Sequence, residues 1–294
     1  MARIPNIYHF VFGLKPQTEP FHLVYYLCIE SCRQVNRPEA IFFHYQHEPH
    51  GPYWEAIKPH LTLRRVDSCA LVENFPYTDT QVAHYRYAHA SDFIRMGPLL
   101  DLGGIYADID TLFVNPLPAS LREKSFVLGR EADVYDFITR RTSPSLCNAV
   151  MLAEKDAPFG RRWQAEMPKA FDGAWAHHSC LLAHALRDRF PEEVHVEPTR
   201  SFYPYMWTRG GLRDLLQRCH RGTEGIYSVH LWNHLWWERG RWDFSFFHGE
   251  RLTWRFIAEV DTTYTVLARR FLPPAPATPE PEPRPWWRRA LGLV

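Results

Sequence analysis

The sequence of 294 residues lacks a long apolar run: no stretch approaches the roughly 18 apolar residues that a membrane-spanning helix needs. It also lacks an Asn-x-Ser/Thr glycosylation site. Its first residues do not show the charged segment followed by an apolar one that is typical of an export signal. These absences favour a cytoplasmic protein.

An excess of charge of one sign is missing too. The 34 Lys and Arg residues nearly balance the 33 Asp and Glu residues, for a formal net charge of +1, which gives no support to nucleic-acid binding. The six cysteines are scattered, and Cys28 and Cys32 stand at helical i, i+4 spacing, as buried small side chains do, rather than in a zinc motif. Reduced thiols agree with a cytoplasmic location.

The order of apolar segments predicts an α/β fold, in which helices flank a mostly parallel central sheet. Strand-like segments at 4–12, 39–44 and 61–66 alternate with helical spacing at 21–35 and 53–60. Further strands are expected at 105–107, 125–129 and 226–231, an apolar segment at 149–153, a loop at 131–146, and further helices at 81–96, 158–171 and 178–189. The pair Gly97-Pro98 should end or kink the helix that contains it.

Two carboxylates, Asp108 and Asp110, stand one residue apart directly after the apolar run 105–107. If that run is a strand, its alternation places both on one side, where they can meet one hard cation whose shell substrate phosphates complete. On the preceding helix, Asp92 and Arg95 stand at i and i+3 and therefore on one face. A carboxylate and a guanidinium so placed can hold sugar hydroxyls. Phosphate and sugar recognition together indicate a nucleotide-sugar site.

The block from Ala90 to Leu112 resembles the DXD-containing glycosyltransferases of the GT-A fold. The similarity is to the group that holds yeast-type mannosyltransferases, α-1,4-galactosyltransferases and bacterial capsule or lipopolysaccharide transferases, whose core the clostridial glucosylating toxins share. The pattern of this group is Ser-Asp-x-x-Arg, a Gly-Gly turn and Tyr-x-Asp-x-Asp, present here as Ser91, Asp92, Arg95, Gly103, Gly104, Tyr106, Asp108 and Asp110. Weaker similarity lies at 4–10 and 229–236. The resemblance implies a Rossmann-like single domain with helical additions.

The resemblance also implies a role for each residue of the block. Asp110 would bind a divalent cation, Mn²⁺ or Mg²⁺, directly, and Asp108 would hold the ribose and reach the cation through water. Asp92 and Arg95 would line the donor-sugar pocket, and Tyr106 would face the nucleotide. The alternative roles are structural: an ion pair within the helix for Asp92 and Arg95, and strand packing for Tyr106.

The closing segment of the family pattern supplies further candidates. His230 or Asn233 is the expected additional ligand of the cation. Trp232, Trp236 or Trp237 is the expected indole donor to the leaving phosphate. The alternative is that this aromatic cluster is a part of the core.

Two more positions carry expectations for donor binding. Many relatives have a tryptophan three residues after the first-strand histidine, and its ring stacks on uracil. Here His9 is followed at that spacing by Phe12, so Phe12 is the expected base-stacking residue, with a smaller ring. Asn148 matches a family position near the donor sugar, and its alternative role is to cap a loop.

The amino-acid composition of the chain changes after residue 272. Residues 273–285 are rich in Pro and Glu and are expected to form an extended linker. Residues 286–294 contain two Trp, two Arg and an apolar end, which suits a membrane interface, although a terminus docked elsewhere is the alternative. We expect a catalytic domain over 1–272 and a peripheral membrane contact through 286–294.

The sequence therefore predicts a metal-dependent glycosyltransferase that moves a sugar from a nucleotide-diphosphate sugar, with UDP expected, to a glycan or lipid-linked acceptor in bacterial surface polysaccharide synthesis. The resemblance implies retention of the anomeric configuration. One alternative is an aspartate-nucleophile phosphatase, whose signature requires Thr or Val where Leu112 stands. Another is a glycan- or nucleotide-binding module without catalysis, in which the paired carboxylates would have no use.

Overall fold

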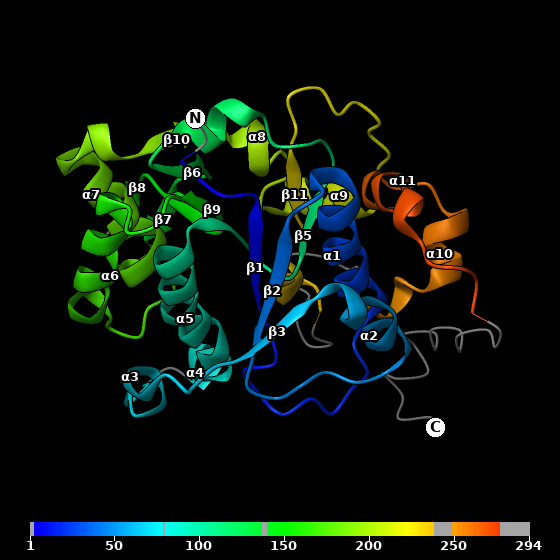
Figure 1. The fold of residues 1–294 in the computed structure, drawn as a ribbon, viewed down its shortest axis with the longest axis horizontal. Coiled ribbons are helices and arrows are strands. Elements are labelled where there is room, and N and C mark those ends of the chain that lie inside the picture. Colours follow the sequence, from blue (N-terminus) through cyan, green and yellow to red (C-terminus); the bar gives the residue numbers. More distant parts are fainter. Residues whose placement is uncertain (1–2, 79, 137–139, 238–248, 277–294) are drawn as a thin grey trace. The chain divides into compact units, whose positions relative to one another are not determined.

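The computed structural model describes residues 3–78, 80–136, 140–237 and 249–276 (Figure 1). Two compact units divide the chain: the first contains Met1–Met206 and Thr223–His230, and the second contains Trp207–Gly222 and the chain from Leu231 onward. The predicted tail at 286–294 and most of the predicted linker at 273–285 lie outside the described residues, so both stay predictions.

A seven-stranded sheet with the strand order β10-β6-β9-β4-β1-β2-β3 forms the centre of the first unit. Its strands are β1 (Ile7–Val11), β2 (Ala40–Tyr45), β3 (Thr62–Arg65), β4 (Gly104–Ala107), β6 (Phe126–Arg130), β9 (Leu146–Ala153) and β10 (His195–Glu197). Strand β9 runs antiparallel to both of its neighbours, and the other pairings are parallel. The predicted α/β class with a mostly parallel central sheet is confirmed.

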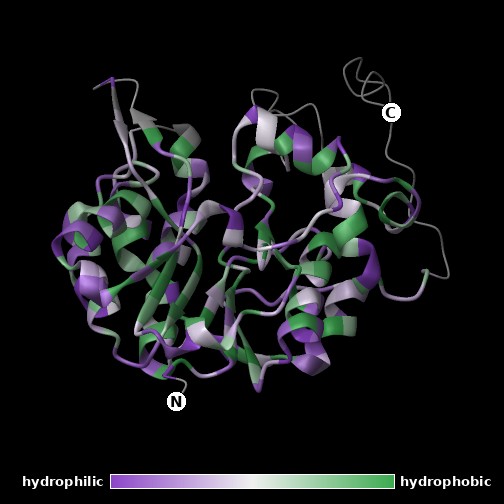
Figure 2. Ribbon diagram, turned by 90° about the horizontal axis from the view of Figure 1, so that it is seen from above, coloured by the Kyte–Doolittle hydropathy of each residue, from purple (hydrophilic) through white to green (hydrophobic). Residues whose placement is uncertain are grey.

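The central strands are buried on both faces, and their composition explains why. Every residue of β4 and of β9 is buried, and the strands in the middle of Figure 2 are mostly hydrophobic. A strand covered on both faces needs an almost continuous apolar sequence, and Leu146–Ala153 meets that need except at Asn148. An amide side chain in an otherwise apolar buried strand marks this position as functional or closely hydrogen-bonded.

Helices cover the sheet of the first unit (Figure 1). They are α1 (Leu23–Asn36), α2 (Pro52–Ile57), α3 (Ala70–Glu73), α4 (Thr80–His84), α5 (Arg86–Leu102), α6 (Pro158–Ala170), α7 (Leu182–Arg189) and α8 (Thr199–Phe202). Leu99 of α5 and Trp163 of α6 belong to one core cluster with Phe126 and Met151 of the sheet. Burial of this cluster fixes α5, and with it Asp92 and Arg95, against the central strands.

The helix predicted over 81–96 is divided and extended. It is interrupted at Tyr85 between α4 and α5, and α5 then continues through Gly97 and Pro98 to Leu102. The end that was one of the two outcomes expected at Gly97-Pro98 is not found, and the other outcome, a kink there, stays a prediction. Pro98 cannot donate a backbone hydrogen bond, and this destabilises the helix. Packing outweighs that loss, because the following Leu99 and Leu100 are fully buried.

Short strands complete the first unit. β5 (Thr111–Phe113) pairs antiparallel with β11 (Ser228–His230). β7 (Val134–Asp136) pairs with β8 (Arg141–Ser143) inside the segment predicted to be a loop, so that prediction is wrong. Strands of three residues are too short to produce a recognisable alternation in the sequence.

The helix predicted over 178–189 is a composite. It begins as the π-helical segment His177–Leu181 and continues as α7. A π-helical turn shifts the side chains after it relative to an α-helix, and such turns are frequent at functional sites.

The second unit contains α9 (Arg209–Leu216), α10 (Trp254–Glu259) and α11 (Thr263–Ala268). The Thr263 hydroxyl at the start of α11 donates to the Asp214 carbonyl of α9 at 2.5 Å and joins these two helices. Throughout the described parts of both units, no helix has the length and apolar character required to cross a membrane. All six cysteines of the chain are free thiols, and Cys28 and Cys32 are fully buried on α1, as predicted.

Candidate functional site

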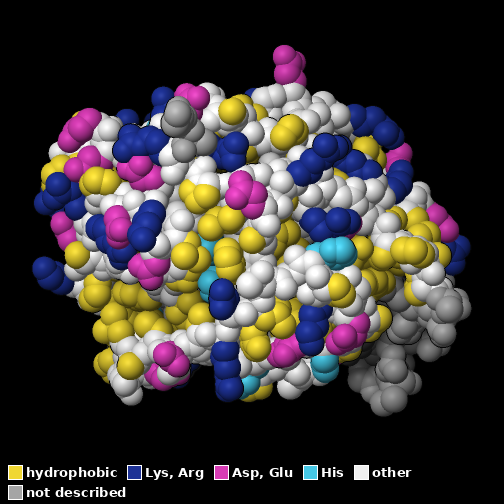
Figure 3. Space-filling view, in the orientation of Figure 1, with side chains coloured by type: hydrophobic (Ala, Val, Ile, Leu, Met, Phe, Trp, Pro, Cys, Tyr) yellow, Lys and Arg dark blue, Asp and Glu magenta, His cyan; other side chains and the backbone are white. Residues whose placement is uncertain are grey.

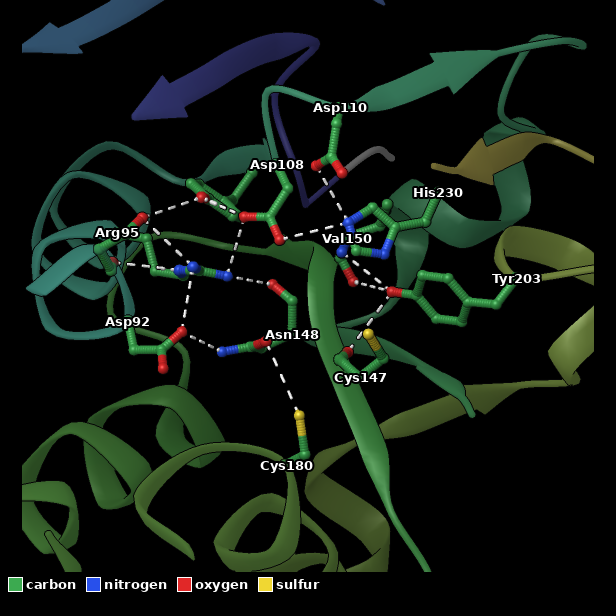
Figure 4. Close-up of polar contacts among 12 residues, drawn as sticks. Asp92, Arg95, Asp108, Asp110, Cys147, Asn148, Val150, Cys180, Tyr203 and His230 are labelled. Atoms are coloured by element: carbon green, nitrogen blue, oxygen red, sulfur yellow. Dashed lines mark hydrogen bonds and ion pairs between the residues drawn. The ribbon is translucent and has the colours of Figure 1, made fainter. Parts of the chain in front are cut away.

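The paired carboxylates meet a histidine beyond the end of β4 (Figure 4). The His230 Nε2 atom lies 3.1 Å from an Asp110 carboxylate oxygen and 3.7 Å from an Asp108 oxygen. The pairing of β11 with β5 places His230 opposite Thr111, next to Asp110. One ligand atom from each of the three side chains lies within 4.8 Å of the other two. Two carboxylates and an imidazole are a suitable donor set for a divalent cation.

The carboxylates converge through a turn and not through a strand. Strand β4 ends at Ala107, and the Thr111 amide donates to the Asp108 carbonyl at 2.9 Å. Asp108 and Asp110 therefore lie in the turn before β5, and it is this turn, not strand alternation, that places them. The turn still directs both carboxylates toward His230.

The Arg95 guanidinium lies at the centre of the charged groups and is buried. It forms ion pairs with Asp92 at 3.0 Å and with Asp108 at 3.1 Å. It also donates to the Asn148 carbonyl at 2.9 Å and lies over the Tyr106 ring, 4.5 Å from the centroid. Burial disfavours the charge of Arg95, yet the carboxylates beside it raise its pKa, so the guanidinium stays charged.

Asp92 has three side-chain partners, and one of them, His178, was not predicted from the sequence. Its Oδ1 atom accepts from Asn148 Nδ2 at 2.7 Å and pairs with Arg95. Its Oδ2 atom lies 3.0 Å from Nε2 of His178, which is completely buried in the π-helical segment. Burial opposes the ionisation of Asp92, but Arg95 and His178 lower its pKa. Asp92 is thus an ionised carboxylate with fixed orientation.

Tyr106 orients the first carboxylate of the pair. It is fully buried, and its hydroxyl donates to Asp108 Oδ1 at 2.6 Å. The Ser91 hydroxyl lies 3.4 Å from the Tyr106 hydroxyl and accepts from Arg95 at 3.2 Å. Burial raises the pKa of Asp108, against the effect of Arg95. The Tyr106 hydroxyl therefore holds Asp108, and the expectation that Tyr106 faces the nucleotide stays a prediction.

A further buried carboxyl group of this region, that of Glu131, was missed in the sequence. Glu131 follows β6, accepts a short hydrogen bond from the Ser145 hydroxyl, and is largely buried. Burial raises its pKa, and the thiols of Cys147 and Cys180 interact with it. The Cys180 thiol in turn lies 3.8 Å from the Asn148 side-chain oxygen. No spacing in the sequence could connect these groups, because they come from different elements.

A pocket of about 560 Å³ opens in the first unit, beside the carboxyl ends of β1 and β2. The residues that line it are Leu14, Lys15, Pro16, Gln46, Cys69, Val72, Glu73, Ala83, His84, Arg86, Tyr87 and Ala90. The Lys15 ammonium lies over the Tyr87 ring, 4.5 Å from its centroid. In the strand order, β2 lies on one side of β1 and β4 on the other, so the pocket lies at a switch point of the sheet, where open α/β folds bind ligands.

Phe12 does not line this pocket. It is half-buried among aromatic rings, with its centroid 5.0 Å from that of Tyr25 and 5.4 Å from that of Phe21. Its expected stacking on a base stays a prediction, and Tyr87 is the aromatic side chain on the pocket wall.

The remaining predicted residues belong to the second unit. Trp232 has a left-handed backbone, with φ of 54°, which is an outlier for so bulky a residue. The Trp236 indole is fully buried and donates to the Leu231 carbonyl at 2.6 Å. Asn233 begins a 3-10 turn. The roles of these three residues, and that of Trp237, stay predictions.

Comparison with known proteins gives a family match. Residues 26–127 match the family described as a glycosyltransferase sugar-binding region containing a DXD motif. That range includes Asp92, Arg95, Asp108 and Asp110. Glucan organizing enzyme 1 of Cryptococcus neoformans var. grubii serotype A is 29% identical over 280 residues, which cover 92% of this chain and 71% of that protein.

Two solved structures are among those that resemble the chain. Galactosyltransferase LgtC in complex with donor and acceptor sugar analogs has a TM-score of 0.47 at 16% identity, over 92% of this chain and 98% of that chain. PaToxG glycosyltransferase has a TM-score of 0.39 at 16% identity, over 64% of this chain and 70% of that chain.

Proposed function

We propose that this chain, a glycosyltransferase with a DXD-containing sugar-binding region over residues 26–127, transfers a sugar from a nucleotide-diphosphate donor with a divalent cation held by Asp108, Asp110 and His230. The observation that carries the proposal is the convergence of these three side chains beside Arg95 (Figure 4). The cation would be Mn²⁺ or Mg²⁺, because the donors are two carboxylates and one imidazole.

The arrangement of Asp108, Asp110 and His230 suits a bound cation. Two carboxylates with oxygens 3.1 and 3.7 Å from one buried imidazole nitrogen repel each other, and a divalent cation relieves that repulsion. When bound, the cation would neutralise the diphosphate and orient it for departure. Arg95 pairs with the Oδ1 atom of Asp108, while the Oδ2 atom of the same carboxylate faces His230.

The donor sugar is proposed to lie against Asp92 and Asn148. Both Asp92 oxygens already accept hydrogen bonds, but an ionised carboxylate offers about four lone-pair sites and can accept sugar hydroxyls as well. Arg95 joins this pair to Asp108, so the groups proposed for the sugar and for the diphosphate form one connected network. Hydrogen bonds within the network fix its geometry before substrate arrives.

The nucleotide is proposed to occupy the pocket at the ends of β1 and β2. Its wall supplies the Tyr87 ring for contact with a base and the cationic side chains Lys15 and Arg86 for the negative charge of the donor. UDP stays the preferred nucleotide because it is the one that the family resemblance implies. Phe12 is a second candidate for the base contact.

The indole donor to the leaving phosphate stays a choice among Trp232, Trp236 and Trp237, as the sequence predicted, and Trp232 is distinguished by its backbone. Its left-handed backbone is a strained conformation of the kind that persists at functional sites. The indole N–H of Trp236 is already bonded to the Leu231 carbonyl. His230 is preferred over Asn233 as the third ligand, because its Nε2 atom lies 3.1 Å from Asp110 and 3.7 Å from Asp108.

The acceptor is proposed to be a glycan. The fungal relative is named a glucan organizing enzyme, so glucan oligosaccharides are the first acceptors to test. Retention of the anomeric configuration, a lipid-linked acceptor, a bacterial surface polysaccharide pathway and a cytoplasmic location remain predictions from the sequence. The phosphatase alternative is disfavoured, because Asp108, its required nucleophile, is bonded by Tyr106 and paired with Arg95.

Calorimetric titration of UDP, with and without Mn²⁺, on the wild type and on Asp110→Asn tests the proposal. We expect binding that requires the metal and is lost in the variant, together with loss of transfer and a melting temperature within a few degrees of the wild type. UDP and GDP are titrated in parallel so that a different base is recognised. Metal-independent binding, or full activity of Asp110→Asn, would refute the proposed metal site.

A further inference from the structure

Tyr77 and His89 form a polar pair beside the donor-sugar residues. His89 lies on α5, three residues before Asp92, and is 1% exposed. Its Nδ1 atom lies 2.7 Å from the hydroxyl oxygen of Tyr77, in the segment between α3 and α4. Figure 3 shows hydrophobic side chains gathered over the region of helices α3 to α6, to which this segment belongs. Polar groups in such surroundings are costly unless they are hydrogen-bonded, so the pair requires an explanation.

The position of each proton in the pair follows from burial. Burial lowers the pKa of His89 from 6.5 to about 4, so its ring is neutral near neutral pH and carries one proton. An imidazole nitrogen accepts a hydrogen bond more strongly than a phenol oxygen does, so the Tyr77 hydroxyl donates to Nδ1. The proton of His89 is therefore on Nε2. This buried atom has no hydrogen-bond partner among the described residues.

His178, in the π-helical segment, lacks a partner of the opposite kind. Its Nε2 atom lies 3.0 Å from the ionised carboxylate of Asp92 and must carry the proton. Its Nδ1 atom is therefore an acceptor, and it too is without a partner in the parts of the chain that the structure describes. The rings of His89 and His178 lie 5.1 Å apart, edge to face at 86°. A donor without an acceptor and an acceptor without a donor thus lie on adjacent rings.

Phenylalanine rings enclose the two imidazoles. The Phe171 ring packs edge to face against His89 at 5.4 Å and against His178 at 4.9 Å. Phe93 stacks on the His178 ring. Interactions between polar groups are screened only weakly in such apolar surroundings. The negative charge of Asp92 accordingly opposes the lowering of the His89 pKa by burial, so the carboxylate and His89 influence each other.

We propose that Tyr77 and His89 are positioning residues for the donor-sugar carboxylate Asp92, and that they act on it through His178. The Tyr77 hydroxyl keeps the proton of His89 on Nε2. This N–H group, on the ring next to His178, favours an unprotonated Nδ1 there, so the proton of His178 stays on Nε2 and is donated to Asp92. Neither Tyr77 nor His89 contacts the sugar in this arrangement. The inference rests on the proposed function of Asp92 and deepens it by naming two residues that support the donor-sugar site.

Nitrogen NMR of the full chain labelled with ¹⁵N-histidine tests this coupling without substrate. In the wild type we expect His89 and His178 to carry their protons on Nε2. Tyr77→Phe retains the ring and removes only the hydroxyl. In this variant we expect His89 to become a mixture of tautomers and the Nε2 proton of His178 to exchange with solvent about fivefold faster, as loss of one neutral hydrogen bond allows. His89→Phe and His178→Phe assign the signals.

The matched control is Tyr8→Phe. The Tyr8 hydroxyl is also buried, and it has no hydrogen-bond partner within the described ranges. Its removal should leave the tautomers of both histidines and the exchange of the His178 proton as in the wild type. Equal changes in Tyr77→Phe and Tyr8→Phe would overturn the proposal, and so would the absence of any change in Tyr77→Phe.

Binding of sugar nucleotides tests the effect on Asp92. UDP, UDP-glucose and UDP-galactose are titrated by calorimetry in the presence of Mn²⁺. Asp92 is proposed to contact the sugar and not the nucleotide. We therefore expect Tyr77→Phe to bind the preferred UDP-sugar about fivefold more weakly, and UDP with unchanged affinity. An equal loss of affinity for both, or no loss for the UDP-sugar, would contradict a positioning role.

Failure of the proposed function would be distinguishable from failure of this inference. If the wild type binds neither UDP nor a UDP-sugar with Mn²⁺, the proposed donor site is wrong. The NMR measurement contains neither metal nor nucleotide, so it still decides whether Tyr77 and His89 control the proton of His178.

Discussion

The Nε2 atom of His178 lies 3.0 Å from a carboxylate oxygen of Asp92, and the imidazole is completely buried. The Phe93 ring stacks on the imidazole at 5.4 Å with an interplanar angle of 3°. The other ring nitrogen, Nδ1, has no hydrogen-bond partner among the described residues. His178 therefore carries its proton on Nε2 and donates it to Asp92, which fixes the direction of that carboxylate.

Loss of this hydrogen bond should impair transfer more than folding. A hydrogen bond to a charged group contributes about 1.5–3 kcal/mol, so we expect His178→Ala to lower kcat/KM by roughly tenfold to a hundredfold. His178→Gln keeps a donor and should recover part of the activity. The neighbouring, half-exposed His177 gives the control His177→Ala, measured for melting temperature as well as kinetics. Wild-type kinetics in His178→Ala would show that His178 has no role in the proposed donor-sugar site.

Removal of the central guanidinium should destabilise the protein. In Arg95→Ala, Asp92 and Asp108 lose their buried counter-charge, and we expect the free energy of unfolding to fall by about 3–5 kcal/mol. Arg95→Lys keeps the charge, but one ammonium group cannot replace the several donors of the guanidinium, so an intermediate loss is expected. Urea denaturation measures both.

The matched control is Arg255→Ala, which breaks an exposed i, i+4 pair with Glu259 and should cost less than about 0.5 kcal/mol. A loss in Arg95→Ala no larger than in this control would mean that the buried network does not contribute to stability.

Two buried histidines should make stability depend on pH. His9 Nε2 lies 2.9 Å from the Gly103 carbonyl and must carry the proton, so His9 Nδ1 accepts from His44 Nε2 at 3.2 Å. Burial lowers the pKa of His9 from 6.5 to about 4, and burial, with His9 and Arg64 nearby, lowers that of His44 to about 3. Below pH 6.5 the unfolded chain binds these protons and the folded chain does not.

Stability that is present above pH 6.5 is therefore lost as the pH falls from 6.5 toward 4. Each such histidine adds a slope of about 1.4 kcal/mol per pH unit. In His44→Gln we expect the slope of the unfolding free energy over this window to decrease by up to that amount. Urea denaturation at several pH values measures it, and an unchanged slope would show that His44 is protonated in the folded state.

The glycine pair Gly103-Gly104, at the start of β4, should be required for the backbone geometry there. Gly104 has φ of +113°, and a Cβ atom there would lie 2.6 Å from the backbone oxygen of Ile7. Strain and this clash together should make Gly104→Ala at least about 2 kcal/mol less stable. The control is Gly97→Ala in α5, where a Cβ atom meets nothing within 4 Å and a gain of about 0.5–1 kcal/mol is expected. Circular dichroism melts distinguish the two, and a Gly104→Ala variant as stable as the wild type would contradict this account.

The sequence by itself determined the sheet and the central motif. Strands β1, β2, β4 and β6 follow from short apolar runs, and helices α1 and α6 from apolar spacing, because burial against a shared core requires those patterns. The pattern Ser91-Asp92 to Asp110 marked the carboxylates and Arg95 as one functional block. Local order in the chain was enough for these predictions.

Only the tertiary structure decided which groups meet. Antiparallel pairing of β5 with β11 brings His230 to Asp110, although 120 residues separate them. Packing of the π-helical segment against α5 brings His178 to Asp92. Neither contact has a periodic signal in the sequence, because a contact between distant elements depends on how the whole core packs. For the same reason, helix α5 continues past Pro98, where the sequence predicted an end or a kink, because Leu99 and Leu100 are buried in the core.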